Sequence, residues 1–306
     1  MKLLVIAHRG NVGSIYSNEN FPDNSFEGID VAIKRENISG IEIDLRLTKD
    51  NHLILCHEPK LNKISDDIGQ INQINYVDLK SVHDVKNYYR IIKMRSFVLQ
   101  NGKELRKIIN EKIKKSVSFV NVYNLFDYLV DKHYTGEIII ELKEQTDCCK
   151  NAVIELINKY KKNLNLTIHS YDILASVEIG DKTGVNNGVL LNHWHLKKLA
   201  NKSIEAFPLS FYSIIWPYCT CKNIKKLIDN GKDLYIWTVD SSYHLLYILK
   251  QLEKVYDKYG VLPNKVAIIT NVPDLINNYL CDENTKINQK CLKLVSMSKN
   301  KTRSYM

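Results

Sequence analysis

Short apolar runs alternate with helix-like segments along most of this 306-residue chain, and that alternation limits the folds it can adopt. The runs are near-continuous stretches rich in Ile, Leu and Val, which is typical of strands buried on both faces. They occupy eight positions, namely residues 3–7, 40–44 with an extension at 53–56, 137–142, 166–169, 188–191, 206–210, 233–239 and 265–270. Buried strands of this kind predict a parallel sheet covered by helices.

Candidate helices fill the intervals between these runs. Their ranges are 25–36, 123–132, 149–161, 171–179, 196–201, 224–230, 243–259 and 273–280. Ser25 is suited to cap the first helix, and Asn230-Gly231 to end another before the next strand. Eight strands alternating with helices predict a closed (β/α)8 TIM barrel. A doubly wound open sheet is the alternative, although no Gly-rich phosphate loop follows the first strand.

We expect one domain over residues 1–282, followed by a tail. The interval 59–119 is too long for a simple connection, so it is expected to be a small insertion over the barrel mouth with a helix near 77–82. Residues 283–306 are basic and lack apolar periodicity, which predicts a flexible tail. The formal net charge of +9 includes this tail, and no nucleic-acid-binding motif is visible. Nucleic acid is therefore not an expected partner.

The cysteine pattern and the length of the apolar runs indicate the cellular compartment in which the protein is expected. Seven cysteines, an odd number, follow neither a disulfide framework nor a zinc pattern, which favours reduced thiols. No run reaches the length of a membrane helix, and no secretory signal is recognisable. We therefore expect a cytoplasmic protein. Membrane contact is not indicated, and the oligomeric state stays open.

Titratable side chains stand where the first strands end. They are His8, Arg9, Glu42, Asp44, His57, Glu141 and Lys143. Residues two apart on a strand share one face, so Glu42 and Asp44 can both point into the barrel mouth. The same spacing joins Glu141 to Lys143. Because active sites of TIM barrels lie at the carboxyl ends of the strands, this pattern predicts a site there.

The residue types indicate metal-assisted phosphoryl chemistry. The carboxylates Glu42, Asp44 and Glu141 offer hard oxygen ligands suited to Mg²⁺ or Ca²⁺. A divalent cation on a phosphate oxygen offsets the charge that repels a nucleophile. Arg9 can bind phosphate oxygens through its planar fork, and Lys143 can add a second positive charge.

Histidines can supply the proton transfers. His8 and His57 titrate near neutrality when unperturbed and can act as general base and general acid. His169 ends the fourth strand, where it can line the mouth or pack. Trp237 can wall the pocket or belong to the core. The pair His193 and His195 lacks a third partner, so a surface position is favoured over a metal site.

These residues resemble the signature of the glycerophosphodiester phosphodiesterase family. The resemblance rests on an ordered series: His8-Arg9-Gly10, Glu42-Ile43-Asp44, Thr48-Lys49-Asp50, His57, Glu141-Leu142-Lys143, Trp237-Thr238-Val239 and Ile269-Thr270-Asn271-Val272-Pro273-Asp274. It implies a TIM barrel that hydrolyses glycerophosphodiesters to an alcohol and glycerol 3-phosphate with a divalent cation, so the expected partner is a small-molecule phosphodiester substrate. It also implies acid/base roles for His8 and His57, metal binding by Glu42, Asp44 and Glu141, and phosphate binding by Arg9 and Lys143.

The chain departs from the family's pattern around the mouth. Pro22-Asp23-Asn24-Ser25 stands for Pro-Glu-Asn-Thr/Ser, Glu58 follows His57 in place of Asp, Asp240 replaces Asn, and Asn271 replaces Asp. The substrate can therefore differ from the simplest glycerophosphodiesters. Two alternatives stay open: a lysophospholipase D or sphingomyelinase D-like phosphodiesterase or lyase on lipids, and a catalytically silent barrel. The head group, the cation and the attacking group, water or the substrate's own hydroxyl, also stay open.

Overall fold

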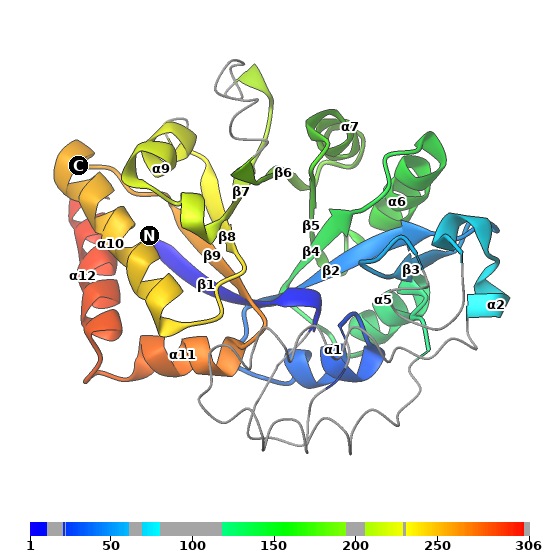
Figure 1. Cartoon of the computed structure of the whole chain (residues 1–306), viewed down its shortest axis with the longest axis horizontal. Helices are drawn as coiled ribbons and strands as arrows, with labels where there is room; N and C mark the ends of the chain where they lie inside the picture. The colour runs from blue at the N-terminus through cyan, green and yellow to red at the C-terminus, as the bar shows by residue number, and fades with distance from the viewer. Residues whose placement is uncertain are drawn as a thin grey trace.

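Eight parallel strands close into a barrel, and helices lie outside it (Figure 1). The computed structural model describes residues 1–10, 21, 23–60, 69–79, 118–193, 206–228 and 231–302. The barrel strands follow the order β1-β9-β8-β7-β6-β5-β4-β2, and the pairing of β1 with β2 closes the ring. The predicted (β/α)8 TIM barrel is therefore confirmed, and the doubly wound open sheet is excluded.

The barrel strands follow the predicted runs closely, with one exception. They are β1 (Lys2–Ala7), β2 (Gly40–Leu47), β4 (Glu137–Leu142), β5 (Asn165–Ser170), β6 (Asn186–Leu191), β7 (Phe211–Ile215), β8 (Asp233–Trp237) and β9 (Lys265–Thr270). The strand predicted at 206–210 is wrong, because β7 begins at Phe211. Pro208 has no N–H to give to a ladder, whereas the β-branched and aromatic residues that follow suit a strand.

The run at 53–56 is a separate strand and not an extension of the second one. Strand β3 (Leu53–Leu55) pairs antiparallel with the end of β2, outside the parallel ring. The chain reverses at Asn51, whose φ of 61° suits a tight turn. This hairpin carries His57, two residues after β3, back toward the carboxyl ends of the barrel strands.

Helices cover the outside of the barrel. They are α1 (Phe26–Ile33), α5 (Val122–Asp131), α6 (Asp147–Tyr160), α7 (Ile173–Thr183), α9 (Cys221–Ile228), α10 (Ser242–Tyr259), α11 (Pro273–Cys281) and α12 (Lys286–Thr302). Ser25 caps α1 as predicted, since its hydroxyl accepts the N–H of Gly28. The helix expected at 196–201 and the helix stop at Asn230 lie outside the described residues. Among the described helices, none has both the length and the apolar character needed to cross a membrane.

The predicted flexible tail is wrong over most of its length. Helix α12 lies against α10 and α11, with Ile287 and Leu294 buried. Lys290 and Lys293 form ion pairs with Glu253 of α10. The apolar stripe is narrow and surrounded by lysines, so its periodicity is weak in the sequence. Packing against α10 explains the helix.

Part of the expected insertion at 59–119 is described. The 3-10 helix η3 (Ile71–Gln73) and helix α2 (Tyr76–Leu79) bury Ile71 and Leu79 against Ile54 of β3. The helix predicted near 77–82 corresponds to α2. Residues 61–68 and 80–117 lie outside the described part, so a cover over the barrel mouth stays a prediction.

The barrel interior is apolar in its middle and polar at both ends. Apolar side chains of β1, β4, β7, β8 and β9 form the middle: Leu4, Ile6, Ile139, Phe211, Tyr235, Ala267 and Ile269. At the amino ends of the strands, Glu137 accepts a hydrogen bond from Thr167 (3.0 Å) and faces Lys265 (3.4 Å). At the carboxyl ends, the same inward rows continue into titratable side chains.

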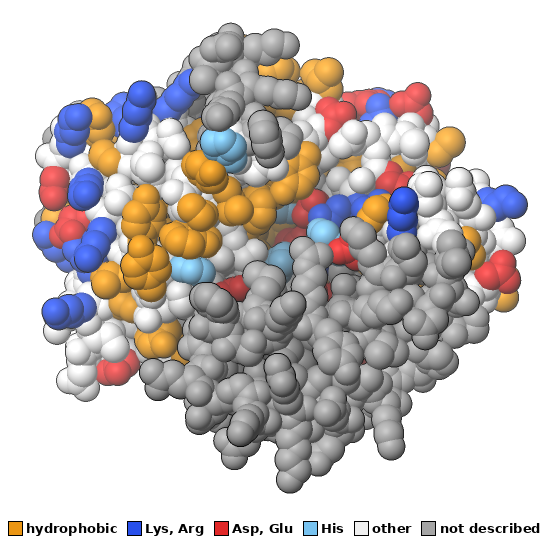
Figure 2. All heavy atoms as spheres, in the orientation of Figure 1, with side chains coloured by type: hydrophobic (Ala, Val, Ile, Leu, Met, Phe, Trp, Pro, Cys, Tyr) orange, Lys and Arg blue, Asp and Glu red, His pale blue; other side chains and the backbone are white. Residues whose placement is uncertain are grey.

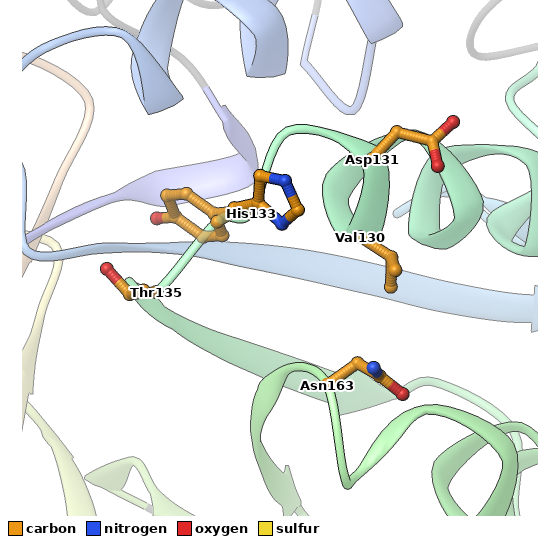
Figure 3. A pocket seen from close by; sticks show the side chains of 6 residues that line it. Val130, Asp131, His133, Thr135 and Asn163 are labelled. Atoms are coloured by element: carbon orange, nitrogen blue, oxygen red, sulfur yellow. The ribbon is translucent and has the colours of Figure 1, made fainter.

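A pocket of about 620 Å³ opens at the amino ends of β4 and β5 (Figure 3). Its lining residues are Val130, Asp131, His133, Tyr134, Thr135 and Asn163. They precede the strands that they adjoin, so this pocket lies at the end of the barrel opposite to the titratable cluster. We assign no function to it.

Candidate active site

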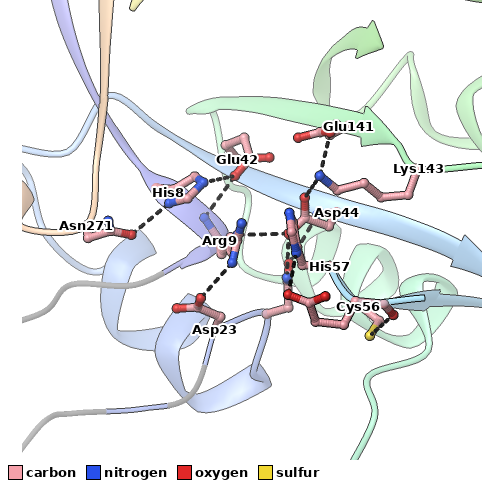
Figure 4. A network of polar contacts seen from close by, with 12 residues as sticks. His8, Arg9, Asp23, Glu42, Asp44, Cys56, His57, Glu141, Lys143 and Asn271 are labelled. Atoms are coloured by element: carbon pink, nitrogen blue, oxygen red, sulfur yellow. Dashed lines mark hydrogen bonds and ion pairs between the residues drawn. The ribbon is translucent and has the colours of Figure 1, made fainter. Parts of the chain in front are cut away.

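The carboxyl ends of the strands bring the predicted polar side chains to one place (Figure 4). In the sheet register Asp44 of β2 lies opposite Glu141 of β4, and Glu141 lies opposite His169 of β5. Glu42 is two residues before Asp44 on the same face. Figure 2 shows histidine, acidic and basic side chains near the centre of this face, with hydrophobic side chains beside them. All seven strand-end residues predicted from the sequence are therefore neighbours.

Arg9 is fixed by acidic side chains on two sides. It lies in the short 3-10 helix η1 (His8–Gly10) with a φ of 55°, a conformation that costs a non-glycine residue about 1 kcal/mol. Its guanidinium pairs with Asp23 Oδ2 (3.0 Å) and Asp44 Oδ2 (3.1 Å). Burial alone would lower the pKa of Arg9, but Asp44 and Asp23 raise it above its usual value. Arg9 therefore stays charged at the site.

Asp44 is fully buried and surrounded by donors. Lys143 Nζ lies 3.0 Å from its Oδ1, and Asn24 Nδ2 donates to its Oδ2 at 2.8 Å. Burial alone would raise the pKa of Asp44, but Lys143 and then Arg9 hold it well below its usual range. Asp44 is thus ionised, and the protein's own cations and amide contact both of its oxygens.

Glu42 and Glu141 are less well compensated. Burial raises the pKa of Glu42 well above its usual range, and the nearby Asp44 and Glu141 add to this. Burial also raises the pKa of Glu141, against the effect of Lys143, which lies 2.5 Å from its Oε1. Within the described part of the chain, Glu42 Oε1 has no hydrogen-bond partner. A bound cation would relieve both groups.

His169 joins these two carboxylates. One ligand atom each from Glu42, Glu141 and His169 lies within 4.8 Å of the others, a spacing that a metal ion could bridge. Burial and then Lys143 lower the pKa of His169 to about 3, so the ring is neutral at neutral pH. The sequence left the role of His169 open and named Asp44 as the third ligand. Among the described residues His169, and not Asp44, stands with Glu42 and Glu141 in the group whose ligand atoms lie within 4.8 Å of one another, and Asp44 lies against Arg9 and Lys143.

His8 is oriented by an amide from the far end of the chain. Its Nδ1 lies 2.7 Å from Asn271 Oδ1, and Asp240 accepts hydrogen bonds from the side chain and the backbone N–H of Asn271, both at 2.8 Å. The opposite nitrogen, Nε2, lies 3.8 Å from Glu42 Oε2. Burial and then Arg9 lower the pKa of His8. Asp240 stands where the family commonly has Asn, and Asn271 where it commonly has Asp. Because these two residues are hydrogen-bonded to each other, the two departures form one structural unit.

His57 is oriented through its neighbours in the hairpin. Its Nδ1 lies 3.2 Å from Glu58 Oε1. Arg46 donates to its backbone carbonyl from Nε (3.1 Å) and Nη2 (2.8 Å), and Glu144 pairs with Arg46 at 3.3 Å. Burial and then Arg9 lower the pKa of His57 to about 4. The ring is therefore neutral at neutral pH.

Sequence reasoning missed several supporting residues. Arg46 continues the inward row of Glu42 and Asp44 at the same two-residue spacing, and this signal could have identified it. Glu144 is placed only by tertiary contacts, which leave no local pattern. Asn24 belongs to the Pro22-Asp23-Asn24-Ser25 element, but its contact with Asp44 is likewise a tertiary one.

The remaining candidates are Trp237 and the pair His193 and His195. Trp237 ends β8, is partly buried and packs edge-on against Tyr171 at 6.2 Å. Its role as a pocket wall stays a prediction. His193 stacks near Tyr218 (5.3 Å), and His195 lies outside the described residues.

Comparison with known proteins places these motifs in a family context. The sequence model of the Glycerophosphoryl diester phosphodiesterase family matches residues 8–275. The glycerophosphodiester phosphodiesterase of Caldanaerobacter subterraneus subsp. tengcongensis is 25% identical over 261 residues, which cover 82% of this chain and 91% of that protein. A Bacillus altitudinis enzyme of the same name is 32% identical over 85 residues, 28% of this chain and 32% of that protein.

Solved structures show the same fold. The Thermotoga maritima glycerophosphodiester phosphodiesterase superposes with a TM-score of 0.57 at 20% identity, covering 90% of this chain and 97% of that one. An Oleispira antarctica phosphodiesterase, in complex with the product sn-glycerol-3-phosphate, superposes with a TM-score of 0.61 at 16% identity. That match covers 94% of this chain and 96% of the other.

Proposed function

Since this chain belongs to the glycerophosphoryl diester phosphodiesterase family and is a phosphoric diester hydrolase, we propose that it cleaves glycerophosphodiesters with two histidines and a divalent cation. The products would be an alcohol and glycerol 3-phosphate. The sn-glycerol-3-phosphate bound to the Oleispira antarctica phosphodiesterase supports this choice of product.

One observation carries the proposal: two partly buried imidazoles of fixed orientation flank a cluster of buried carboxylates. In His8 and His57 an acceptor faces Nδ1, the amide of Asn271 or the carboxylate of Glu58. A neutral ring keeps its proton on that nitrogen, so Nε2 presents its lone pair. Such a ring can accept a proton as a general base.

Each polar residue then has a task in phosphodiester cleavage. One imidazole accepts the proton of the attacking hydroxyl at Nε2. The other takes a proton from solvent when the negatively charged substrate binds, and it donates that proton to the alcohol oxygen as its bond to phosphorus breaks. Arg9 and Lys143 supply fixed positive charge for the phosphate oxygens. A divalent cation held by Glu42 and Glu141, with Asp44 beside them, would withdraw further charge from the phosphate.

The direct test is release of glycerol 3-phosphate by the purified protein. With a divalent cation present, we expect turnover of glycerophosphocholine and a loss of about 10²–10⁴-fold in kcat for His57→Ala and for His8→Ala. His133→Asn is the control, because His133 is exposed at the opposite end of the barrel and its φ of 52° suits Asn.

Two outcomes would contradict the proposal. Turnover of lysophosphatidylcholine alone would indicate a lipid phosphodiesterase. No release from any diester, together with no effect of His57→Ala on ligand binding, would indicate a catalytically silent barrel.

A further inference from the structure

His169 is a buried polar group for which the fold supplies no partner. The side chain is 1% exposed and lies at the carboxyl end of β5. Neither of its ring nitrogens has a hydrogen-bond partner among the described residues. Buried polar groups are nearly always bonded to protein, water or an ion, so an unpartnered imidazole points to a ligand.

The sheet register places the His169 imidazole beside two carboxylates. His169 pairs in register with Glu141 on the neighbouring strand, and ligand atoms of His169, Glu141 and Glu42 lie within 4.8 Å of one another. Glu42 Oε1 is likewise without a hydrogen-bond partner in the described part of the chain. Two side chains of one group of candidate ligands, His169 and Glu42, therefore each carry an unpartnered buried atom.

Asp44 does not complete this group in the same way. Its Oδ1 lies 3.0 Å from Lys143 Nζ, and its Oδ2 contacts both Arg9 Nε (3.1 Å) and Asn24 Nδ2 (2.8 Å). Both oxygens of Asp44 thus lie beside the protein's own cations, although Oδ1 accepts no hydrogen bond within the described residues. His169 makes no such contact, so the candidate donor set contains an imidazole nitrogen besides carboxylate oxygens.

We infer that His169 is a direct ligand of the ion and that the site prefers a first-row transition cation, with Mn²⁺ as its representative, over Mg²⁺ and Ca²⁺. Mg²⁺ and Ca²⁺ take oxygen ligands almost exclusively, whereas an imidazole nitrogen suits the transition series. The inference rests on the proposed function, because it names the ion that the proposed phosphodiesterase would use. The sequence led us to expect Mg²⁺ or Ca²⁺ because only three carboxylates were counted as ligands. With His169 as a ligand, we propose a transition cation instead.

The test measures ion binding by the full chain without substrate. Calorimetric titration should give a Kd for Mn²⁺ about tenfold or more below those for Mg²⁺ and Ca²⁺. His169→Gln should abolish that preference while changing the Mg²⁺ and Ca²⁺ affinities little. His133→Asn should keep the preference, which controls for adventitious binding by surface histidine.

A spectroscopic measurement on the unaltered protein makes the result independent of whether a variant folds. Pulsed paramagnetic resonance of bound Mn²⁺ should show coupling to one directly coordinated nitrogen, and His169→Gln should remove it. Mn²⁺ bound with oxygen ligands only, or equal weakening of all three ions by His169→Gln, would overturn the inference.

The two proposals fail separately. Nitrogen-coordinated Mn²⁺ in a protein that releases no glycerol 3-phosphate would support the ion site and contradict the proposed function. Hydrolysis of glycerophosphocholine with an all-oxygen ion site would contradict this inference and leave the function standing.

Discussion

Burial at the site sets the protonation of single residues, and His57 shows the consequence most directly. Its pKa of about 4 results first from burial and then from the charge of Arg9, while Glu58 acts in the opposite direction. A base that loses its proton near pH 4 is active across the neutral range. The site therefore keeps its imidazoles neutral without needing an alkaline medium.

The pH profile should report this shift. We expect the acidic limb of kcat/KM to lie well below pH 6.5, the usual pKa of histidine. Glu58→Gln removes a negative charge that favours the protonated ring, so the pKa of His57 falls and the limb moves to lower pH. The measurement is kcat/KM for glycerol 3-phosphate release from pH 4 to 9 in both proteins. A limb that stays near 6.5, or moves upward in the variant, would contradict this assignment.

The strand-end residues could be predicted because their information is local. Glu42 and Asp44, like Glu141 and Lys143, are placed on one face by their two-residue spacing. Asn24 reaches Asp44, and Asn271 reaches His8, only through closure of the barrel. The inferred role of His169 as an ion ligand was missed for the same reason. His169 lies beside Glu141 only because of the register between β4 and β5, which the sequence does not show.

Different elements support catalysis at one end of the barrel and stability at the other. In TIM barrels the carboxyl ends of the strands carry chemistry and the amino ends carry stability. The hairpin of β2 and β3 serves the chemistry at the carboxyl ends, because it positions His57. The polar network around Glu137 serves stability at the amino ends.

Arg46 is the residue that ties His57 to β2. It donates two hydrogen bonds to the His57 carbonyl, at 3.1 and 2.8 Å. We expect Arg46→Met to lower kcat by about tenfold or more through misplacement of the imidazole, with a smaller change in KM. Glu144→Gln should cost less, because Arg46 keeps both bonds to the carbonyl. Arg35→Met is the control, since Arg35, in the loop after α1, pairs with Asp274 of α11 outside the barrel. Equal activity of Arg46→Met and Arg35→Met would contradict the positioning role.

Lys265 is the corresponding residue at the amino end. It lies 3.4 Å from Glu137, whose side chain is nearly buried, and also contacts the hydroxyl of Tyr235. Lys265→Met leaves Glu137 without its cation, and we expect a loss of about 3 kcal/mol in the free energy of unfolding. Urea unfolding measures it. Because the network is at the opposite end from His8 and His57, kcat of the folded variant should be unchanged. A large loss of kcat with unchanged stability would place this network in the active site.

The whole molecule is closed by contacts between its two ends. Strand β1 pairs with both β2 and β9, and Asn271, directly after β9, orients His8, directly after β1. The site thus forms only when the ring is complete. The eight alternating strand and helix units predict the barrel from the sequence. The packing of α12 on the outside of the barrel could not be predicted, because it depends on contacts with α10 that leave no local pattern in the sequence.

Helix α12 offers a matched pair of residues to test that cover. Leu294 is fully buried, whereas Leu292 on the same helix is 59% exposed. Leu294→Ala should lower the free energy of unfolding by about 3 kcal/mol, because it leaves a cavity between α12 and its neighbours. Leu292→Ala should change it by less than about 0.5 kcal/mol. Urea unfolding of both variants measures the difference, and kcat of the folded proteins should match the parent. Equal stability of the two variants would mean that the segment does not pack in solution and would restore the flexible tail.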